Sequence, residues 1–451
     1  MLFVAGIWYL ATDQARFVQP KLFVDSIVYI QTAAQHASLQ HLFYPKPIVV
    51  PAIYRGLGAD PSAIAQFQFY FMLASWSAFG VVLLAAVRRL SVRVAIVIMT
   101  FAFVLTPYRI GFTASILSES INESLAMLII TIGFVLALAA RWKPGRRRTI
   151  ACWLLAMFTA VLALAWIMSR DTNAITALVA TLVAALLWRL HRRVREAPWA
   201  VVLAALVVIG SVFAIWTATV RPRAPTQLTT HINFPPELTA RATFPLINNI
   251  MIRVVPDHDA RAYFADHGLP LADELAAHTD QWVEDDRGVL TDPHFEPARQ
   301  WMVAHGTSTY ARWLLRHPIT RATEIGAEMR EILVPQTLKG YMPKGWLYGW
   351  GWLRRPIRNI TNNEVIVLLL ALALPFVMRR PRAHIVTGVA LVLIVSGLIG
   401  AIAAYYGDAF EISRHCYGAG QQIVLGLFLA PLGWFDRRSR ARFDVPDAAA
   451  Q

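Results

Sequence analysis

The segment "ESINESLAMLIITIGFVLALAARWKPGRRR", residues 119–148, contains the pattern that decides the fold. A long apolar run follows two acidic residues and ends in a cluster of arginine and lysine. A helix needs about 20 apolar residues to cross about 30 Å of hydrocarbon. Cations just beyond such a run mark the cytoplasmic side of a membrane. The segment therefore predicts a transmembrane helix at 119–140 and a cytoplasmic loop after it.

The same pattern recurs along the whole chain. Of its 451 residues, 57% are hydrophobic and 16% are charged, whereas soluble domains carry about 25% charged residues. We predict an all-α polytopic membrane protein of about ten transmembrane helices. They are expected at residues 1–17, 67–87, 94–109, 119–140, 150–168, 173–189, 199–219, 363–378, 385–405 and 419–434.

Short basic loops on one side of these helices account for the net charge of +14. They lie at 88–93, 141–148, 189–196, 379–384 and 435–443. Since arginine and lysine gather in cytoplasmic loops, the charge indicates the lipid bilayer as partner, and we expect no nucleic acid. The topology puts Cys152 and Cys416 on opposite sides of the membrane, so we expect no disulfide between them.

Two long segments fall on the other face, and they divide the chain into three parts. We predict an N-terminal transmembrane module at 1–219 with a first outer loop at 18–66. A mainly helical extracytoplasmic domain follows at 220–362, and C-terminal helices with a basic tail occupy 363–451. The loop domain ends in a tract rich in tryptophan and arginine that favours the headgroup zone. This tract is either an interfacial anchor or a platform for a lipid or a sugar, with the rings of Trp346, Tyr348, Trp350 and Trp352.

Charged residues at the outer ends of predicted helices are the candidates for chemistry, because polar groups at that depth are costly unless they line a cavity. Asp25, with Tyr29 one turn later, could accept a proton from a hydroxyl group, or Asp25 could simply cap a helix. Glu119 and Glu123 share a helical face. They could orient a substrate or a basic partner, or only charge a helix start.

Two further groups contain cations. Arg170 and Asp171 form the tip of a helical hairpin, where the arginine could reach an anion or the turn could simply be solvated. Arg414 and His415 stand before the last helix, which we expect to begin near Gly418 and to direct its positive dipole end at the same place. A guanidinium there could hold a phosphate in bidentate fashion or anchor a headgroup.

In their order along the chain, several short motifs resemble those of the GT-C superfamily of polytopic glycosyltransferases, the bacterial relatives of the protein O-mannosyltransferases. "VDSIVYIQTAAQH" resembles the Asp-Ser-x-x-Tyr-x-x-x-Ala stretch of the family's first outer loop, and "FYPKPIVVPAIYRGLGADPSAIAQFQFYF" resembles the tract after it. "SILSESINESLAMLI", "SRDTNAITAL" and "SRHCYGAGQQIVLGLFL" resemble the later acidic, arginine-containing and final-helix motifs. The resemblance covers roughly the first 190 residues and 405–434.

The resemblance implies an inverting enzyme that takes a sugar from a polyprenyl-phosphate donor at the outer face of the bacterial inner membrane. The acceptor would be a glycan, a lipid or a protein. By position, Asp25 would be the general base, Glu119 the later acid and Arg414 the arginine near the donor phosphate. Many relatives carry two adjacent acids in the first loop, whereas Ser26 follows Asp25 here, and we therefore expect no obligatory metal. We expect no other cofactor.

Three alternatives remain open. An O-antigen ligase or polymerase would use a diphosphate-linked glycan and would depend on loop histidines such as His305 or His317. A lipid or sugar transporter would form no covalent bond and would carry charges within its spans. An assembly factor without catalysis would tolerate both Asp25→Asn and Arg414→Ala.

Overall fold

The computed structural model describes residues 6, 8, 9, 12, 18–35, 42–43, 46–139, 145–190, 198–220, 240–278, 287–335, 338–341, 355–356, 363–378, 385–409 and 411–443. Within these ranges the protein is helical and forms no strand. An isolated bridge pairs Lys21 with Ser115. Trp346, Tyr348, Trp350, Trp352, the basic loop at 379–384 and nearly all of the predicted first span lie outside the described residues.

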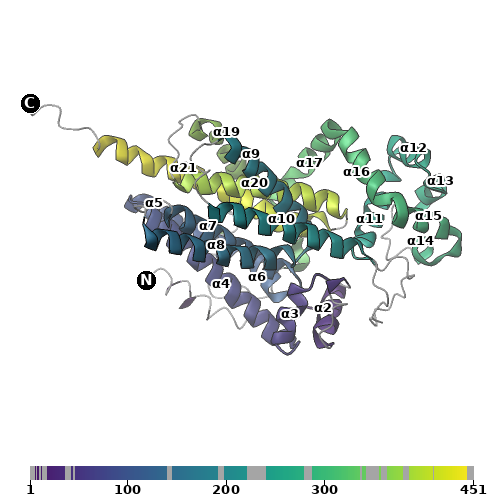
Figure 1. The fold of residues 1–451 in the computed structure, drawn as a ribbon, viewed down its shortest axis with the longest axis horizontal. Coiled ribbons are helices and arrows are strands. Elements are labelled where there is room, and N and C mark those ends of the chain that lie inside the picture. Colours follow the sequence, from purple (N-terminus) through teal and green to yellow (C-terminus); the bar gives the residue numbers. More distant parts are fainter. Residues whose placement is uncertain are drawn as a thin grey trace, which may run out of the picture.

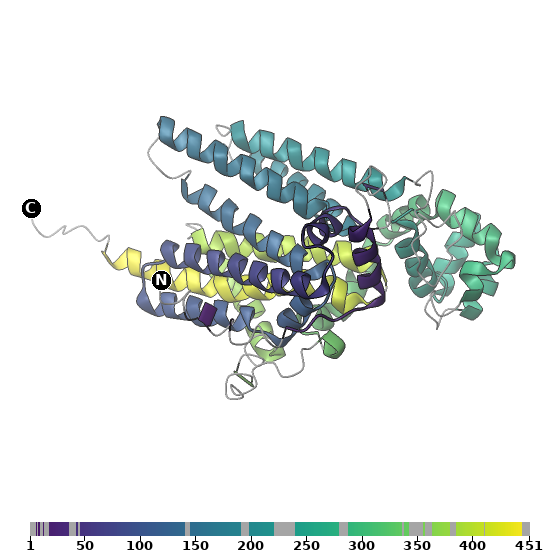
Figure 2. The ribbon, with the colours of Figure 1, turned by 90° about the horizontal axis from the view of Figure 1, so that it is seen from below.

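Long apolar helices form a bundle whose axes run roughly parallel in Figures 1 and 2. The first half of the chain contributes α4 (Pro61–Ala86), α5 (Leu90–Val104), α6 (Pro107–Ala114), α7 (Glu119–Ala139), α8 (Arg146–Ile167), α9 (Asp171–Leu190) and α10 (Pro198–Thr219). The second half contributes α19 (Glu364–Met378), α20 (Ile385–Gly407) and α21 (Ile412–Phe443). Local signals fix the helix starts: at α4, Asp60 accepts hydrogen bonds from two backbone amides and Pro61 follows it.

Six of the described helices are long and apolar enough to cross a membrane, or seven if the bent pair α5 and α6 is one span. The predictions of an all-helical fold and of several membrane-type helices are confirmed. The number ten goes beyond this count, because α9 does not meet the same criteria and α19 is shorter.

The predicted span at 94–109 is not one straight helix. It ends at Val104 and turns by 46° before α6 begins at Pro107. Proline fits the first position of a helix, where its missing N–H leaves no bond unmade. Every residue of α6 is buried, including Arg109. The bend therefore directs α6 into the bundle, whereas α5 has exposed apolar side chains such as Val94 and Ile98.

Close approach of α20 and α21 depends on glycines. A Cβ atom at Gly397 would lie 2.7 Å from the carbonyl oxygen of Ala419, and one at Gly426 would lie 2.6 Å from that of Ala390. Small residues at such contacts let two helix backbones pack tightly in a membrane. The free thiol of Cys416 is buried near this interface, and Cys152 is also buried and unpaired, as expected.

The first loop folds into two short helices at one end of the bundle. These are α2 (Val24–Ala34) and α3 (Val49–Gly56). Arg55 on α3 donates hydrogen bonds to the carbonyl groups of Thr32 and Ala33. These carbonyl groups lie at the end of α2, where the helix itself supplies no donors for them. The contacts hold α2 against α3.

At the same end lies a helical unit, which we call the loop module (residues 240–333). It contains α11 (Thr243–Asn249), η4 (Ile250–Val254), α12 (His258–Asp266), α13 (Ala272–Leu275), η5 (Ala276–His278), α14 (Arg287–Thr291), η6 (Pro293–Phe295), α15 (Glu296–Trp301), η7 (Met302–Gly306), α16 (Thr307–Arg316) and α17 (Pro318–Leu333). Much of it has its own apolar core, in which Phe264, Met302 and Trp313 are buried. The helical character predicted for this loop is present in its described residues, and Pro318 begins α17 two residues after α16 ends at Arg316.

Candidate functional site

Asp25 occupies the second position of α2, at the loop-module end of the bundle. Phe23 precedes the helix, and its backbone N–H donates to the hydroxyl group of Ser26 at 2.9 Å. Asp25 is therefore not the helix cap that the sequence left as an alternative. Its side chain is 33% exposed and is directed to charged groups from other helices.

Two cations hold the carboxylate of Asp25. Lys46 Nζ lies 2.6 Å from Oδ1, and a terminal nitrogen of Arg414 lies 3.1 Å from Oδ2. Lys46 comes from the segment before α3, whereas Arg414 comes from the first turn of α21. Lys46 also lies 5.4 Å from the ring centre of Tyr29, so this predicted residue borders the pair through its aromatic face.

Arg414 connects three carboxylates. Besides Asp25, its Nε lies 3.3 Å from Glu119, and its second terminal nitrogen lies 2.7 Å from Glu411. Glu411 has a positive φ of 45° immediately before α21 and accepts a hydrogen bond of 2.9 Å from Tyr341. A non-glycine residue in this conformation is strained and persists only where its surroundings hold it. The contacts of Glu411 with Tyr341 and Arg414 hold the backbone in this conformation at the start of α21.

Arg170 and His415 complete the group. Arg170 lies 3.9 Å from Glu119 and 2.5 Å from Nδ1 of His415. Because a guanidinium only donates, Nδ1 of His415 accepts from Arg170. The other ring nitrogen, Nε2, lies 3.4 Å from a terminal nitrogen of Arg414 and 3.7 Å from Asp408. We call these side chains the charge cluster: Asp25, Lys46, Glu119, Arg170, Glu411, Arg414 and His415.

The charges of this cluster balance. Lys46, Arg170 and Arg414 face the carboxylates Asp25, Glu119 and Glu411. These opposite charges offset one another, and arginine and lysine side chains are also the usual ligands of phosphate groups. An anion that reached the cluster would therefore compete with carboxylates for the same donors.

The pKa of Asp25 reflects this competition. Burial alone would raise the pKa of Asp25, but the charges of Lys46 and Arg414 and the hydrogen bond from Lys46 outweigh burial and hold it well below its ordinary value. Burial alone would lower the pKa of Lys46, but the charge of Asp25 raises it above its usual range. In the free protein Asp25 is thus a stable anion and a weak base.

The other two predicted acids lie elsewhere. Asp171, next to Arg170, forms a bidentate pair with Arg241 at 3.0 and 3.3 Å. Arg241 also donates to the carbonyl group of Leu42 at 2.6 Å. This arginine joins the first loop, α9 and the start of the loop module, so Asp171 has a connecting role and does not face the charge cluster.

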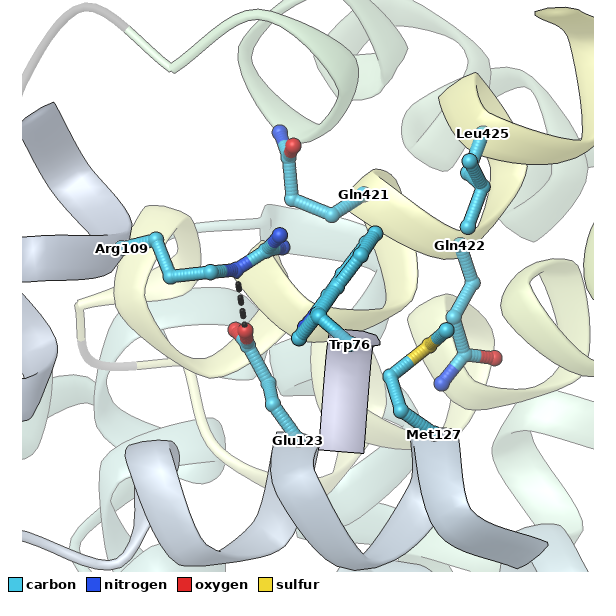
Figure 3. Close-up of a pocket in the computed structure, with 8 residues that line it drawn as sticks. Trp76, Arg109, Glu123, Met127, Gln421, Gln422 and Leu425 are labelled. Atoms are coloured by element: carbon cyan, nitrogen blue, oxygen red, sulfur yellow. Dashed lines mark hydrogen bonds and ion pairs between the residues drawn. The ribbon is translucent and has the colours of Figure 1, made fainter. Parts of the chain in front are cut away.

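Glu123 belongs to a separate polar site inside the bundle (Figure 3). It pairs with Arg109 of α6 at 3.2 Å, and the Arg109 guanidinium lies 4.1 Å from the ring centre of Trp76. Glu119 and Glu123 share a helix but contact different cations: Glu119 contacts Arg414 and Arg170, and Glu123 contacts Arg109. The pocket beside this pair is lined by Trp76, Arg109, Glu123, Met127, Gly418, Gln421, Gln422 and Leu425.

The last helix begins earlier than predicted. It starts at Ile412, so Gly418 lies inside it and a Cβ there would contact the side chain of Glu123. Arg414 and His415 belong to its first turn instead of preceding it. The predicted basic loop from 435 is also a continuation of this helix.

Several residues of the site were not identified from the sequence. Lys46 stands between two prolines in "YPKPIVV", and this isolated cation next to a carboxylate-bearing loop was the available signal. Glu411 and Tyr341 carry no local signal, because their contacts depend on the tertiary fold. Arg109 was the last residue of a predicted span, and a charge at that place is itself a functional indication.

Comparisons with known proteins add no family to this geometry. A scan against protein-family models found no match, and a search of curated proteins found none. In the described part of the chain, no three histidine, cysteine or acidic side chains gather as metal ligands. The expectation that no metal is required stays a prediction.

Proposed function

We propose that this protein is a membrane-embedded inverting glycosyltransferase that moves a sugar from a polyprenyl-phosphate donor to a hydroxyl group. The acceptor would be an envelope glycan, a lipid or a protein. The observation that carries the proposal is the position of Asp25, a partly exposed carboxylate held by Lys46 and Arg414 where an apolar bundle ends. A lipid donor would keep its tail among the helices and its phosphate at this level.

Each step of the transfer has a candidate group in the charge cluster. The acceptor oxygen forms a bond to the anomeric carbon of the sugar, on the face opposite the phosphate. The bond from that carbon to the phosphate oxygen breaks, and its electron pair leaves with the phosphate. The acceptor proton passes to the carboxylate of Asp25. Lys46 and Arg414 stabilise the charge on the leaving phosphate.

Donor binding would also activate the base. Lys46 and Arg414 hold Asp25 in the free protein and lower its pKa. A donor phosphate that drew these cations away would raise the pKa of Asp25 and make it a stronger base. Glu119 and Glu411 would keep Arg414 in place during this exchange, since both contact the same guanidinium.

The remaining predicted residues would support binding. Arg170 lies between Glu119 and His415, and both Arg170 and His415 could contact the sugar or its phosphate. Tyr29 offers an aromatic face next to Lys46. Glu123 and Asp171, in their separate pairs, would stabilise the elements that carry the cluster.

We propose ten spans, with the charge cluster facing the periplasm or the cell exterior from a bacterial inner membrane. Helices α9 and α19 and a span at 1–17 would bring the seven candidates to ten. The basic segment between α4 and α5 lies beside the basic end of α21, at the opposite end of the bundle from the loop module. There Asp436 accepts hydrogen bonds from the backbone amides of Arg88 and Arg89. Basic segments favour the cytoplasm, which supports this orientation.

The ligase alternative is weaker on present geometry. His305 lies on η7 and His317 between α16 and α17, both in the loop module, and His317 contacts the carbonyl group of Trp313. The charge cluster is formed by other residues. A ligase that depends on these histidines would require a second site.

The proposal is tested with purified protein in lipid nanodiscs and a panel of radiolabelled polyprenyl-phosphate sugars, incubated with membrane extract. Formation of a labelled product together with free polyprenyl phosphate would support it. Turnover of a diphosphate-linked glycan, with no turnover of any monophosphate donor, would favour a ligase or polymerase. Movement of sugar across vesicle membranes without a new covalent bond would indicate a transporter.

A further inference from the structure

The corner between α16 and α17 exposes apolar and basic side chains together. Leu315 and Ile319 are each 80% exposed. Arg312 and Arg316 are exposed on the same part of α16 as Leu315. Arg312 donates to the carbonyl group of Ser308, and the Arg316 guanidinium lies 5.4 Å from the ring centre of Tyr263 on α12. The opposite face of α16 buries Trp313 in the core of the loop module. This corner, residues 312–320, is thus an amphipathic edge with no apolar cover within the described chain.

Contacts of α17 place the corner close to the membrane boundary. The hydroxyl group of Tyr406, in the last turn of α20, donates to the carbonyl group of Arg321 at 2.5 Å, only two residues after Ile319. At the other end of α17, Glu331 accepts a hydrogen bond of 2.8 Å from Ser413 in the first turn of α21. Since α20 and α21 are candidate spans, α17 lies across their ends, where hydrocarbon meets water.

The arrangement of helices in Figure 1 agrees with a position of the corner near the membrane boundary. Helix α17 lies beside the ends of α20 and α21, whereas α12 to α15 lie farther from the bundle. A surface at the headgroup level is expected to combine apolar side chains that enter the acyl boundary with cations that meet lipid phosphates. The corner has both, with Leu315 and Ile319 for the first and Arg312 and Arg316 for the second.

We propose that residues 312–320 dock the loop module on the bilayer that holds the bundle. Leu315 and Ile319 enter the boundary between headgroups and acyl chains, and Arg312 and Arg316 bind phosphates of anionic lipids. The occupant of this surface is therefore lipid and not a protein partner, because the surface lies beside spans of the same chain. Docking would hold the loop module at a fixed height over the charge cluster.

The test uses the full chain in nanodiscs made of phosphatidylcholine alone or with phosphatidylglycerol. An environment-sensitive fluorophore is attached to Leu315→Cys or, separately, to Ile319→Cys. Asp259→Cys on α12 is the matched control, because its side chain is fully exposed and lies on the far part of the loop module. Unsubstituted protein gives the background from the buried Cys152 and Cys416.

We expect labels at both corner positions to shift to shorter emission wavelengths and to be quenched by lipids that carry a doxyl group near the headgroup. The Asp259→Cys label should show neither effect. Phosphatidylglycerol should strengthen quenching at the corner, and each of Arg312→Gln and Arg316→Gln should reduce the ratio of docked to free corner about fivefold in those discs.

Corner labels that match the Asp259→Cys label in both kinds of nanodisc would overturn the proposal. So would labels that are shielded in native membranes but become water-exposed when the protein is purified into nanodiscs, since a protein would then be the partner. Unfolding temperatures equal to that of the unsubstituted protein confirm that the labelled variants are folded.

Discussion

The guanidinium group of Arg414 lies 3.1 Å from the carboxylate of Asp25, although 389 positions separate the two residues. The pair joins the first turn of α2 to the first turn of α21. Glu119 at the start of α7 contacts the same guanidinium at 3.3 Å. A single buried arginine therefore holds the ends of three helices together, and it does so with carboxylates that a bound anion could replace.

Arg414→Gln should destabilise the protein. The side chain of Arg414 is 9% exposed and its removal leaves Asp25, Glu119 and Glu411 close together without this cation. Breaking a buried charge pair from one side costs about 3–5 kcal/mol, so a clearly lower unfolding temperature is expected. Adding Glu119→Gln should restore part of the stability but not donor binding. An Arg414→Gln protein as stable as the unsubstituted protein would contradict this account.

The stability contribution of Asp25 should be constant from about pH 5 to pH 9. The pKa of Asp25 is lowered in the folded protein, so its contribution is present above its ordinary pKa and is lost as the pH falls towards the folded value. The pKa of Lys46 is raised, so its contribution is lost only as the pH rises above the ordinary lysine value. The measurement is the difference in unfolding temperature between unsubstituted protein and Asp25→Asn across this range. If this difference in unfolding temperature changed between pH 5 and pH 7, Asp25 would titrate near neutrality in the folded protein. It would then not be paired with Lys46 and Arg414.

Glu123→Gln should lower stability without a specific effect on the donor. Its carboxylate pairs with Arg109 inside the bundle, and Arg109 would become an unpaired buried charge. The expected loss is about 3 kcal/mol, whereas the KM for a donor should change little. The double variant Arg109→Met with Glu123→Met should be more stable than Glu123→Gln alone. A large rise in KM with unchanged unfolding temperature would instead place Glu123 at the substrate.

Transfer activity should survive chelation of divalent metals. The positive charges for a donor phosphate are supplied by Lys46 and Arg414. Protein treated with EDTA and dialysed should keep its activity within about twofold, a free-energy difference below about 0.5 kcal/mol. Loss of activity that manganese or magnesium restores would show that the cluster holds a metal.

Helix positions were largely predictable from the sequence, because blocks of apolar residues have few alternatives to a span. The bend between α5 and α6 was missed, although Pro107 at a helix start is a local signal for it. The start of α21 was placed too late because Arg414 and His415 are polar and interrupt the apolar run. Their burial by partners from other helices is not visible in the local pattern.

The sequence predicted which residues gather in the candidate site better than it predicted which of them contact one another. Asp25, Glu119, Arg170, Arg414 and His415 are brought together as the shared sidedness of their helices suggested. Helical periodicity put Glu119 and Glu123 on one face of α7. In the structure Glu119 contacts Arg414 of α21, whereas Glu123 contacts Arg109 of α6. Contacts between side chains of different helices depend on how the helices pack. The local sequence pattern does not show which side chains this packing brings together.

The most direct test compares sugar transfer by unsubstituted protein and by Asp25→Asn, each purified in nanodiscs with equal amounts of folded protein. Asp60→Asn is the matched control, because Asp60 caps α4 outside the cluster and asparagine is an equally good cap. We predict that Asp25→Asn lowers kcat about 100-fold to 10,000-fold, as expected for loss of a general base, while Asp60→Asn keeps full activity. Transfer by Asp25→Asn at the rate of the unsubstituted protein would contradict the central claim that this carboxylate accepts the proton of the acceptor hydroxyl.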